Sequence, residues 1–177
     1  MTTIVKKEVQ AYEIHTEAGD CALVVLETAP QFLRVMAHGS YGTFAYTWTA
    51  PGDNPLDFMS EIDFDYAMSK LRGDFMVLCK ESQSEDFFKK IKSMRKNGEL
   101  SKEEARELSE EFSSILEDSD GKHEFYNNLM SHQTLCDFFQ DYDKDFKLMP
   151  EGNCVGFWND IWCPLIKSLK ETKSIST

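Results

Sequence analysis

Residues 35–71 read VMAHGSYGTFAYTWTAPGDNPLDFMSEIDFDYAMSKL, and the pattern along this stretch decides the fold. Gly39 and Gly42 bound a tight turn, because glycine takes positive φ without a Cβ clash. From Thr43 to Trp48 aromatic side chains alternate with small ones, which is the period of a β-strand. The prolines that follow stop this strand, and Pro55 suits the first position of a helix. The stretch therefore predicts a hairpin that leads directly into a helix.

The predicted helix covers residues 55–72 and packs against the sheet, ending at Gly73. Apolar side chains recur along it at helical spacing, so one face points inward. These inward residues are Leu56, Met59, Ile62, Tyr66 and Leu71. We expect an aromatic seam in which the side chains of Phe44, Tyr46 and Trp48 contact this helix.

Further strands precede this hairpin. Apolar or alternating runs at residues 6–14, 21–27 and 31–37 indicate three strands before the one at 43–47. Their connections are short, which favours an antiparallel meander. The short apolar run at 75–79 fits either a fifth strand or the start of a helix.

The second half of the chain is predicted to be helical. Ser84 is an N-cap candidate, and Ser101 with Glu104 forms a capping box, so residues 84–117 read as an αα-hairpin. Helices at 122–130, 132–142 and 157–170 follow, and Pro164 should kink the last helix or mark a late start.

The predicted fold class is α+β: a four- to five-stranded antiparallel sheet with a packed helix, followed by a helical C-terminal half. We expect a single domain over residues 1–177, with the sheet and central helix in 1–80 and the helical part in 81–171.

Composition restricts the function classes. The 177 residues carry a net charge of −12, which argues against unaided binding to nucleic acid or to an anionic membrane. No apolar run reaches the roughly 20 residues that span a bilayer, and the N-terminus has no signal-peptide pattern, so a cytoplasmic protein is expected. The five cysteines are odd in number and widely spaced, which indicates reduced thiols.

The quoted stretch also carries a resemblance. The run HGSYGTFAYTW, the helix ending FDYAMSKL and the C-terminal CVGFWNDIWCPLIKSL resemble a set of uncharacterised small acidic proteins of bacteriophages and prophages. Members share a Gly-bounded turn, an aromatic strand ending in Trp, and a Trp-rich C-terminal helix. The resemblance implies a phage or prophage origin, and it assigns no functional residue.

The distribution of charge suggests a binding surface. Carboxylates crowd residues 99–124, and helical pitch turns many of them away from the core. Such an array could present negative charge as nucleic acid does and occupy the basic groove of a host protein. The candidate partner-binding residues are Glu103, Glu104, Glu107, Glu110, Glu111, Asp118, Asp120, Phe157, Trp158 and Trp162. A basic run at residues 89–96 makes the molecule polarised.

Two alternative interpretations stay open. One is a small enzyme or metal-dependent module, which would use His132 with Cys136, spaced i, i+4 as half a zinc site, or the carboxylates of the central helix. Those carboxylates are Asp57, Glu61, Asp63 and Asp65. The other is an accessory protein with no role against host defence.

No residue set spells out a reaction, and the acidic loops lack several ligands of a calcium site. We therefore expect no cofactor, no metal and no enzymatic activity. The favoured hypothesis is a phage protein that acts by protein–protein binding, as a monomer or homodimer. It would inhibit a host defence factor, as anti-CRISPR and anti-restriction proteins do.

Overall fold

The computed structural model describes residues 2–136, 139 and 146–175, and these form two compact units. The first, which we call the sheet unit, combines Met1–Phe75 with Pro150–Thr177. The second, the helical unit, is Met76–Met149. The helical unit is therefore an insertion between two segments of the sheet unit, and each unit is described by itself below.

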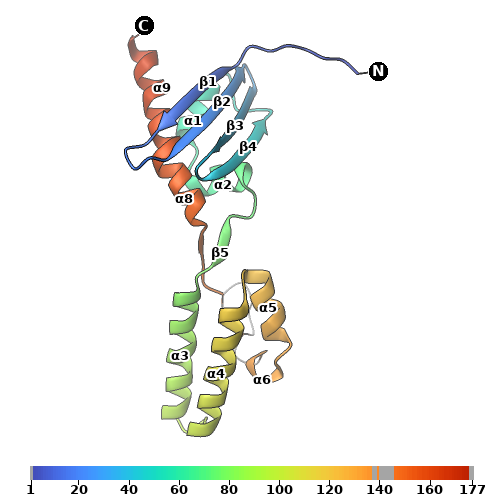
Figure 1. Cartoon of the computed structure of the whole chain (residues 1–177), viewed down its shortest axis with the longest axis vertical. Helices are drawn as coiled ribbons and strands as arrows, with labels where there is room; N and C mark the ends of the chain where they lie inside the picture. The colour runs from blue at the N-terminus through green and yellow to red at the C-terminus, as the bar shows by residue number, and fades with distance from the viewer. Residues whose placement is uncertain (1, 137–138, 140–145, 176–177) are drawn as a thin grey trace. The chain divides into compact units, whose positions relative to one another are not determined.

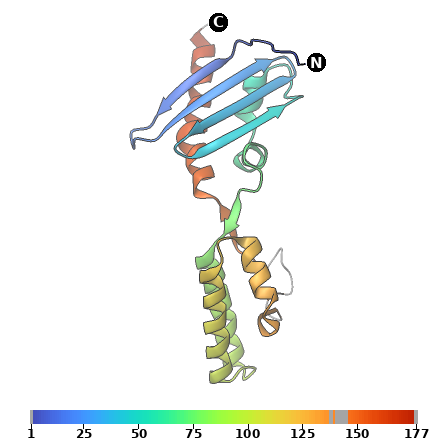
Figure 2. The ribbon, with the colours of Figure 1, turned by 45° about the vertical axis from the view of Figure 1, so that its right-hand side comes forward.

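A four-stranded antiparallel meander forms the sheet unit, with strand order β1-β2-β3-β4 (Figures 1 and 2). Its strands are β1 (Gln10–His15), β2 (Cys21–Ala29), β3 (Phe32–Gly39) and β4 (Gly42–Trp48). Val24 lies beside Ala37, which lies beside Phe44, and all three are buried on the inner face. The predicted α+β fold and meander are confirmed.

The short apolar run after the central helices does not extend this sheet. It forms β5 (Met76–Leu78), which pairs with β6 (Leu148–Pro150) in a separate two-stranded sheet. The main sheet therefore has four strands.

The prediction of one helix over residues 55–72 is wrong. The structure has α1 (Pro55–Glu61) and α2 (Phe64–Leu71), with Ile62 extended at φ −69° and ψ 140° between them. The carboxylate of Asp63 accepts the N–H of Tyr66 at 2.8 Å, so this residue caps a new helix.

Because the helix is interrupted between Glu61 and Phe64, the residues of α2 that face the core differ from those predicted for one continuous helix. Met59 and Leu71 are buried as predicted, but Tyr66 is 40% exposed, and Ala67 and Met68 fill the core instead. From α1 the ring of Phe58 meets Trp48 at a centroid distance of 5.8 Å, and within β4 the ring of Tyr46 meets it at 4.9 Å.

The last helix covers the same face of the sheet as α1 (Figure 2). It runs through α8 (Gly152–Gly156), the π-helical η1 (Phe157–Trp162) and α9 (Cys163–Ile175). The rings of Phe157 and Phe44 stack with centroids 4.0 Å apart. The sequence-based partition, which placed this helix with the helical half, is therefore wrong.

Pro164 is accommodated by the wide π turn rather than by a late start of the helix. The N–H of Cys163 donates to the carbonyl of Trp158, five residues back. Proline has no N–H of its own to donate, so a π-helical turn just before it is a physically reasonable solution.

The helical unit contains the predicted αα-hairpin. Within its described residues the helices are α3 (Lys80–Lys96), α4 (Lys102–Asp118), α5 (Lys122–Met130) and the short α6 (Gln133–Cys136). Phe87 and Phe112 stack at 3.8 Å between α3 and α4, and the capping box of Ser101 and Glu104 is present. The predicted helix at 132–142 extends onto residues 137, 138 and 140–142, which lie outside the described residues.

Helix α3 begins four residues earlier than predicted. Its N-cap position is Cys79, and Ser84 lies inside the helix. The early start places Gln83 in the interior, where its side-chain oxygen accepts the backbone N–H of Lys147 at 2.8 Å. A buried hydrogen bond of this kind offsets the cost of burying the amide.

The core of the sheet unit should be sensitive at Trp48, which is 5% exposed. We expect Trp48→Ala to lower the free energy of unfolding by about 3–5 kcal/mol, because it leaves a large cavity. Trp48→Phe should cost much less, since the buried indole N–H has no hydrogen-bond partner in the described structure and its removal relieves a desolvation penalty. Urea unfolding followed by circular dichroism measures both variants. Equal losses for both would contradict this account.

Candidate partner-binding groove

An acidic groove lies along one edge of α4. Glu104, Glu107 and Glu111 follow one another at spacings of three and four residues, so their side chains share one stripe of the helix. Together with Leu100, Leu108 and Thr134 they line a groove of about 180 Å³. The groove lies wholly within the helical unit.

The three carboxylates have different surroundings. Glu104 accepts the backbone N–H of Ser101 at 2.8 Å, and this hydrogen bond lowers the pKa of its carboxyl group. Glu111 is hydrogen-bonded to Nδ1 of His132. Glu107 is exposed and makes no ion pair or hydrogen bond within the described part of the chain. Glu107 is therefore the carboxylate with the most freedom to bind an external cation.

The shape of the groove suits a long basic side chain. Leu108 is 7% exposed and Leu100 is half-buried, so the floor is apolar while the rim is negative. A lysine or arginine could lay its methylene stem over the leucines and place its charged head among the carboxylates.

The structure separates the other predicted acidic residues from this groove. Glu103 and Glu110 lie on the adjoining exposed edge of α4, and Glu110 pairs with Arg106 at 3.6 Å. Asp118 and Asp120 lie at the far end of α4, where Asp118 accepts a hydrogen bond from Ser114 at 3.3 Å. The predicted acidic residues therefore fall into three places: the groove, the exposed edge of α4 beside it, and the C-terminal end of α4, which is not part of the groove.

The predicted aromatic binding residues are mostly core residues. Phe157 is 2% exposed and Trp162 is 1% exposed, so both side chains are almost wholly buried in this structure. Phe157 stacks on Phe44 of the sheet, and Trp162 packs against Phe157 and also lines the groove described next. Only Trp158 is partly exposed, stacked on Trp162 at 6.0 Å.

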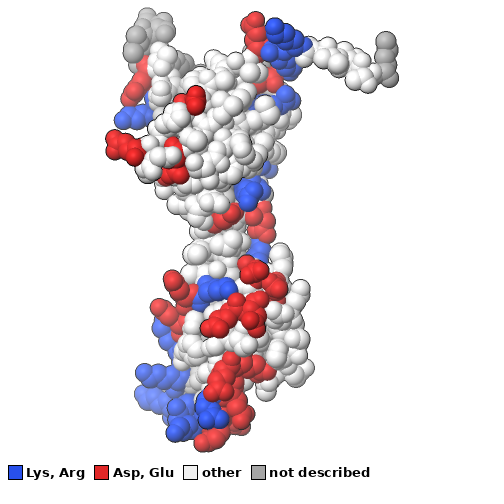
Figure 3. All heavy atoms as spheres, in the orientation of Figure 1, with Lys and Arg blue, Asp and Glu red and all other residues white. Residues whose placement is uncertain are grey.

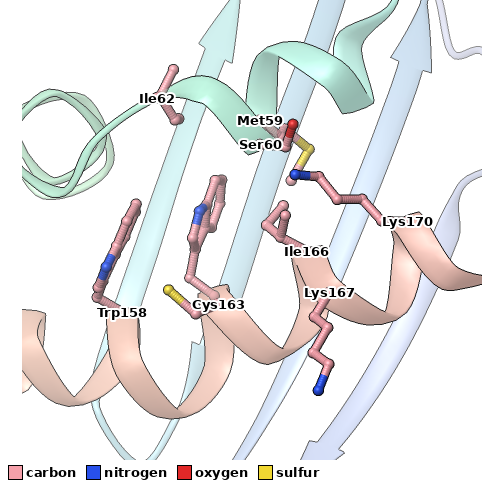
Figure 4. Close-up of a pocket in the computed structure, with 9 residues that line it drawn as sticks. Met59, Ser60, Ile62, Trp158, Cys163, Ile166, Lys167 and Lys170 are labelled. Carbon is pink, nitrogen blue, oxygen red and sulfur yellow. The ribbon is translucent and has the colours of Figure 1, made fainter.

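Trp158 belongs to a second groove, which the sequence did not reveal. This groove has a volume of about 300 Å³ and lies between α1 and the last helix (Figure 4). Its apolar lining includes Met59, Ile62 and Ile166 beside the two tryptophans, and the side chain of Lys170 extends toward Met59 and Ser60. Only the helical spacing of residues 158, 162 and 166 in the sequence hinted that they share a face.

The residues of the metal-or-enzyme alternative do not come together. Asp63 is occupied as the cap of α2, and Glu61 and Asp65 lie on two different helices rather than on one. His132 is bonded to Glu111, while the thiol of Cys136 lies 3.5 Å from the carbonyl oxygen of Leu129. Within the described ranges, no three His, Cys, Asp or Glu side chains are grouped to hold a metal ion. All five cysteines are free.

A further titratable cluster ties the last helix to the strand turns. The hydroxyl group of Tyr41 lies 2.7 Å from a carboxylate oxygen of Asp160 and 3.0 Å from one of Asp20. Hydrogen bonding to Asp160, followed by desolvation and the bond to Asp20, raises the pKa of Tyr41 well above its ordinary value. The hydroxyl group of Tyr41 thus links Asp20, before β2, with Asp160 of η1.

The raised pKa of Tyr41 predicts a pH effect on stability. The folded state holds the phenol proton more tightly than the unfolded state, so this contribution is present below about pH 10 and falls as the pH rises further. We expect the melting temperature of Tyr41→Phe to be lower than that of the wild type at neutral pH and to decline less once the pH rises above about 10. Thermal scans between neutral and alkaline pH test this. Parallel curves for the two proteins would refute the role of Tyr41, and Tyr66→Phe, at a tyrosine that is 40% exposed, is the matched control.

Comparison with known proteins gives a family. No curated protein and no solved structure is significantly similar to the chain. None of the helices in the described ranges has the length and apolar character required to cross a bilayer. The model of one phage protein family matches residues 2–169. That match covers nearly the whole chain, so this protein belongs to that phage family.

Proposed function

We propose that this phage protein acts by binding a host protein through the acidic groove and the adjoining edge of α4. The partner presents a basic surface, and the most fitting partner is a defence factor that handles nucleic acid, such as a CRISPR or restriction enzyme. The protein then works as an inhibitor in the cytoplasm of the host cell, by occupying the surface that nucleic acid would occupy, and it needs no catalysis.

The observation that supports this proposal is the stripe of carboxylates on α4. Glu103 and Glu107 are exposed and make no ion pair among the described residues, and the three groove carboxylates repeat at intervals of roughly 4.5 to 6 Å along the helix. A regular row of negative charges produces a directed field that speeds the encounter with a basic surface.

The apolar part of the groove makes binding more specific than electrostatic attraction alone would. Leu100 and Leu108 offer an apolar contact beside the carboxylates, so a partner side chain can gain both burial and charge pairing. A purely solubilising surface requires no such combination, because exposed carboxylates alone are enough to keep a protein soluble.

Two steps test the proposal: isolation of the host partner, and then measurement of its binding to a variant in which acidic residues of α4 are replaced by lysine. The tagged protein is used to isolate its partner from host lysate, and binding of the purified partner is then measured at low and at moderate salt. The triple variant Glu103→Lys, Glu107→Lys and Glu110→Lys should bind at least about tenfold more weakly at low salt, with a flatter salt dependence. Folding should be retained, since exposed substitutions usually change stability by no more than about 0.5 kcal/mol each.

The matched control reverses three exposed glutamates of the sheet unit, Glu8, Glu17 and Glu61, so that the change in net charge is the same. This control should bind as the wild type does. Full binding by the α4 variant with unchanged salt dependence would contradict the proposal. An isolated partner that neither binds nor processes nucleic acid would favour the accessory role instead.

A further inference from the structure

The opposite edge of α4 carries a groove of the opposite charge. This basic groove lies between α3 and α4, has a volume of about 590 Å³ and is lined by five cationic side chains but no acidic one. The five are Lys92, Arg95, Lys96, Lys102 and Arg106. Figure 3 shows Lys and Arg side chains gathered at the free end of the hairpin beside the acidic side chains.

Most of these cations are not neutralised by the protein. Arg106 pairs with Glu110 at 3.6 Å, and the other four make no ion pair within the part of the chain that the structure describes. Lys92 and Lys96 are four residues apart on α3, as are Lys102 and Arg106 on α4, and like charges at this spacing repel each other. An anion bound in the groove would relieve this repulsion.

Stabilisation of the helices explains only part of the cluster. Arg95 and Lys96 lie in the last turn of α3, where the helix dipole favours positive charge. Lys102 is the first residue of α4, where the same dipole disfavours it. Its position beside the other cations therefore points to a ligand rather than to helix stability.

The basic groove also has an aromatic wall. Phe88 lines it and is 39% exposed, although its neighbours Ile91 and Ala105 in the same groove are buried. The ring of Phe88 contacts those of Phe112 and Phe87 edge-on, with centroid distances of 6.3 Å and 5.7 Å. An exposed ring next to several cations matches a ligand that has both a flat ring and negative charge.

We propose that this groove binds a nucleotide, with its phosphates on the cations of α3 and α4 and its base against Phe88. The volume falls within the roughly 300–1,000 Å³ typical of small-molecule sites. The cations span only a turn or so of each helix, which is enough for a few phosphates. A long nucleic acid strand would continue past them toward the carboxylate stripe of α4 and be repelled. The site is separate from the acidic groove, so the inference does not depend on the proposed function.

Titration calorimetry at low salt without magnesium tests the proposal, with ATP, inorganic tripolyphosphate and a short single-stranded oligodeoxynucleotide as probes. We expect ATP to bind the full-length protein and the double variant Lys92→Gln, Lys102→Gln to bind it at least about tenfold more weakly. The matched control Lys167→Gln, Lys170→Gln removes the same charge from the sheet unit and should bind ATP as the wild type does.

A second variant separates the two halves of the site. Phe88→Leu should weaken binding of ATP several-fold and leave tripolyphosphate unaffected, because only ATP has a base to stack. Absence of ATP binding, or equal ATP affinity in the wild type and the Lys92→Gln, Lys102→Gln variant, would overturn the proposal. Tighter binding of the oligodeoxynucleotide than of ATP would overturn it in favour of a nucleic-acid surface.

Discussion

The sheet unit depends on one long-range contact, the stack of Phe44 on Phe157 at 4.0 Å. One ring comes from β4 and the other from η1, and the whole helical unit lies between them in the sequence. The residue that covers the inner face of the sheet at Phe44 therefore comes from a segment after the insertion, so residues 1–75 alone do not complete the core of the sheet unit. A contact between such distant residues also carries a large loop-closure entropy, which extensive burial must offset.

The backbone is shaped to permit this contact. A Cβ atom at Gly156, just before Phe157, would lie 2.3 Å from the ring of Tyr41. Glycine therefore allows η1 to approach the β3–β4 turn closely, and the Tyr41 hydroxyl then reaches Asp160. The same turn thus provides both the steric fit and the polar tie that hold the last helix against the sheet.

Local patterns predicted local structure well. Strand alternation identified the meander, and the capping box with its apolar spacing identified α4 and its inner face. Two failures have physical causes. Helical periodicity continues through Ile62 and Asp63, but the capping bond of Asp63 favours a new start. The return of the last helix to the sheet is a tertiary contact, which no local pattern encodes.

The candidate surfaces likewise combine features that local sequence patterns predict with features that depend on the tertiary fold. The acidic stripe of α4 follows from helical spacing, so the sequence predicted its carboxylates, while the leucine floor and the His132 contact required the fold. The aromatic run that includes Trp162 predicts a surface anchor, because exposed aromatic side chains often anchor interfaces. The burial of Trp162 depends on which side of the last helix meets the sheet, and that is set by distant strands.

Net charge is a poor guide to what this molecule binds, because α4 divides its charges between two edges. Ala105, Leu108 and Phe112 face the core, so the remaining positions form one edge beside α3 and another beyond it. Lys102 and Arg106 fall on the first edge, and Glu103 and Glu107 on the second. At physiological salt the screening length is about 8 Å, so a ligand at one edge is influenced mainly by the charges of that edge. A chain with a net charge of −12 can therefore present a local cationic surface, because its net charge describes the field only at distances beyond the screening length.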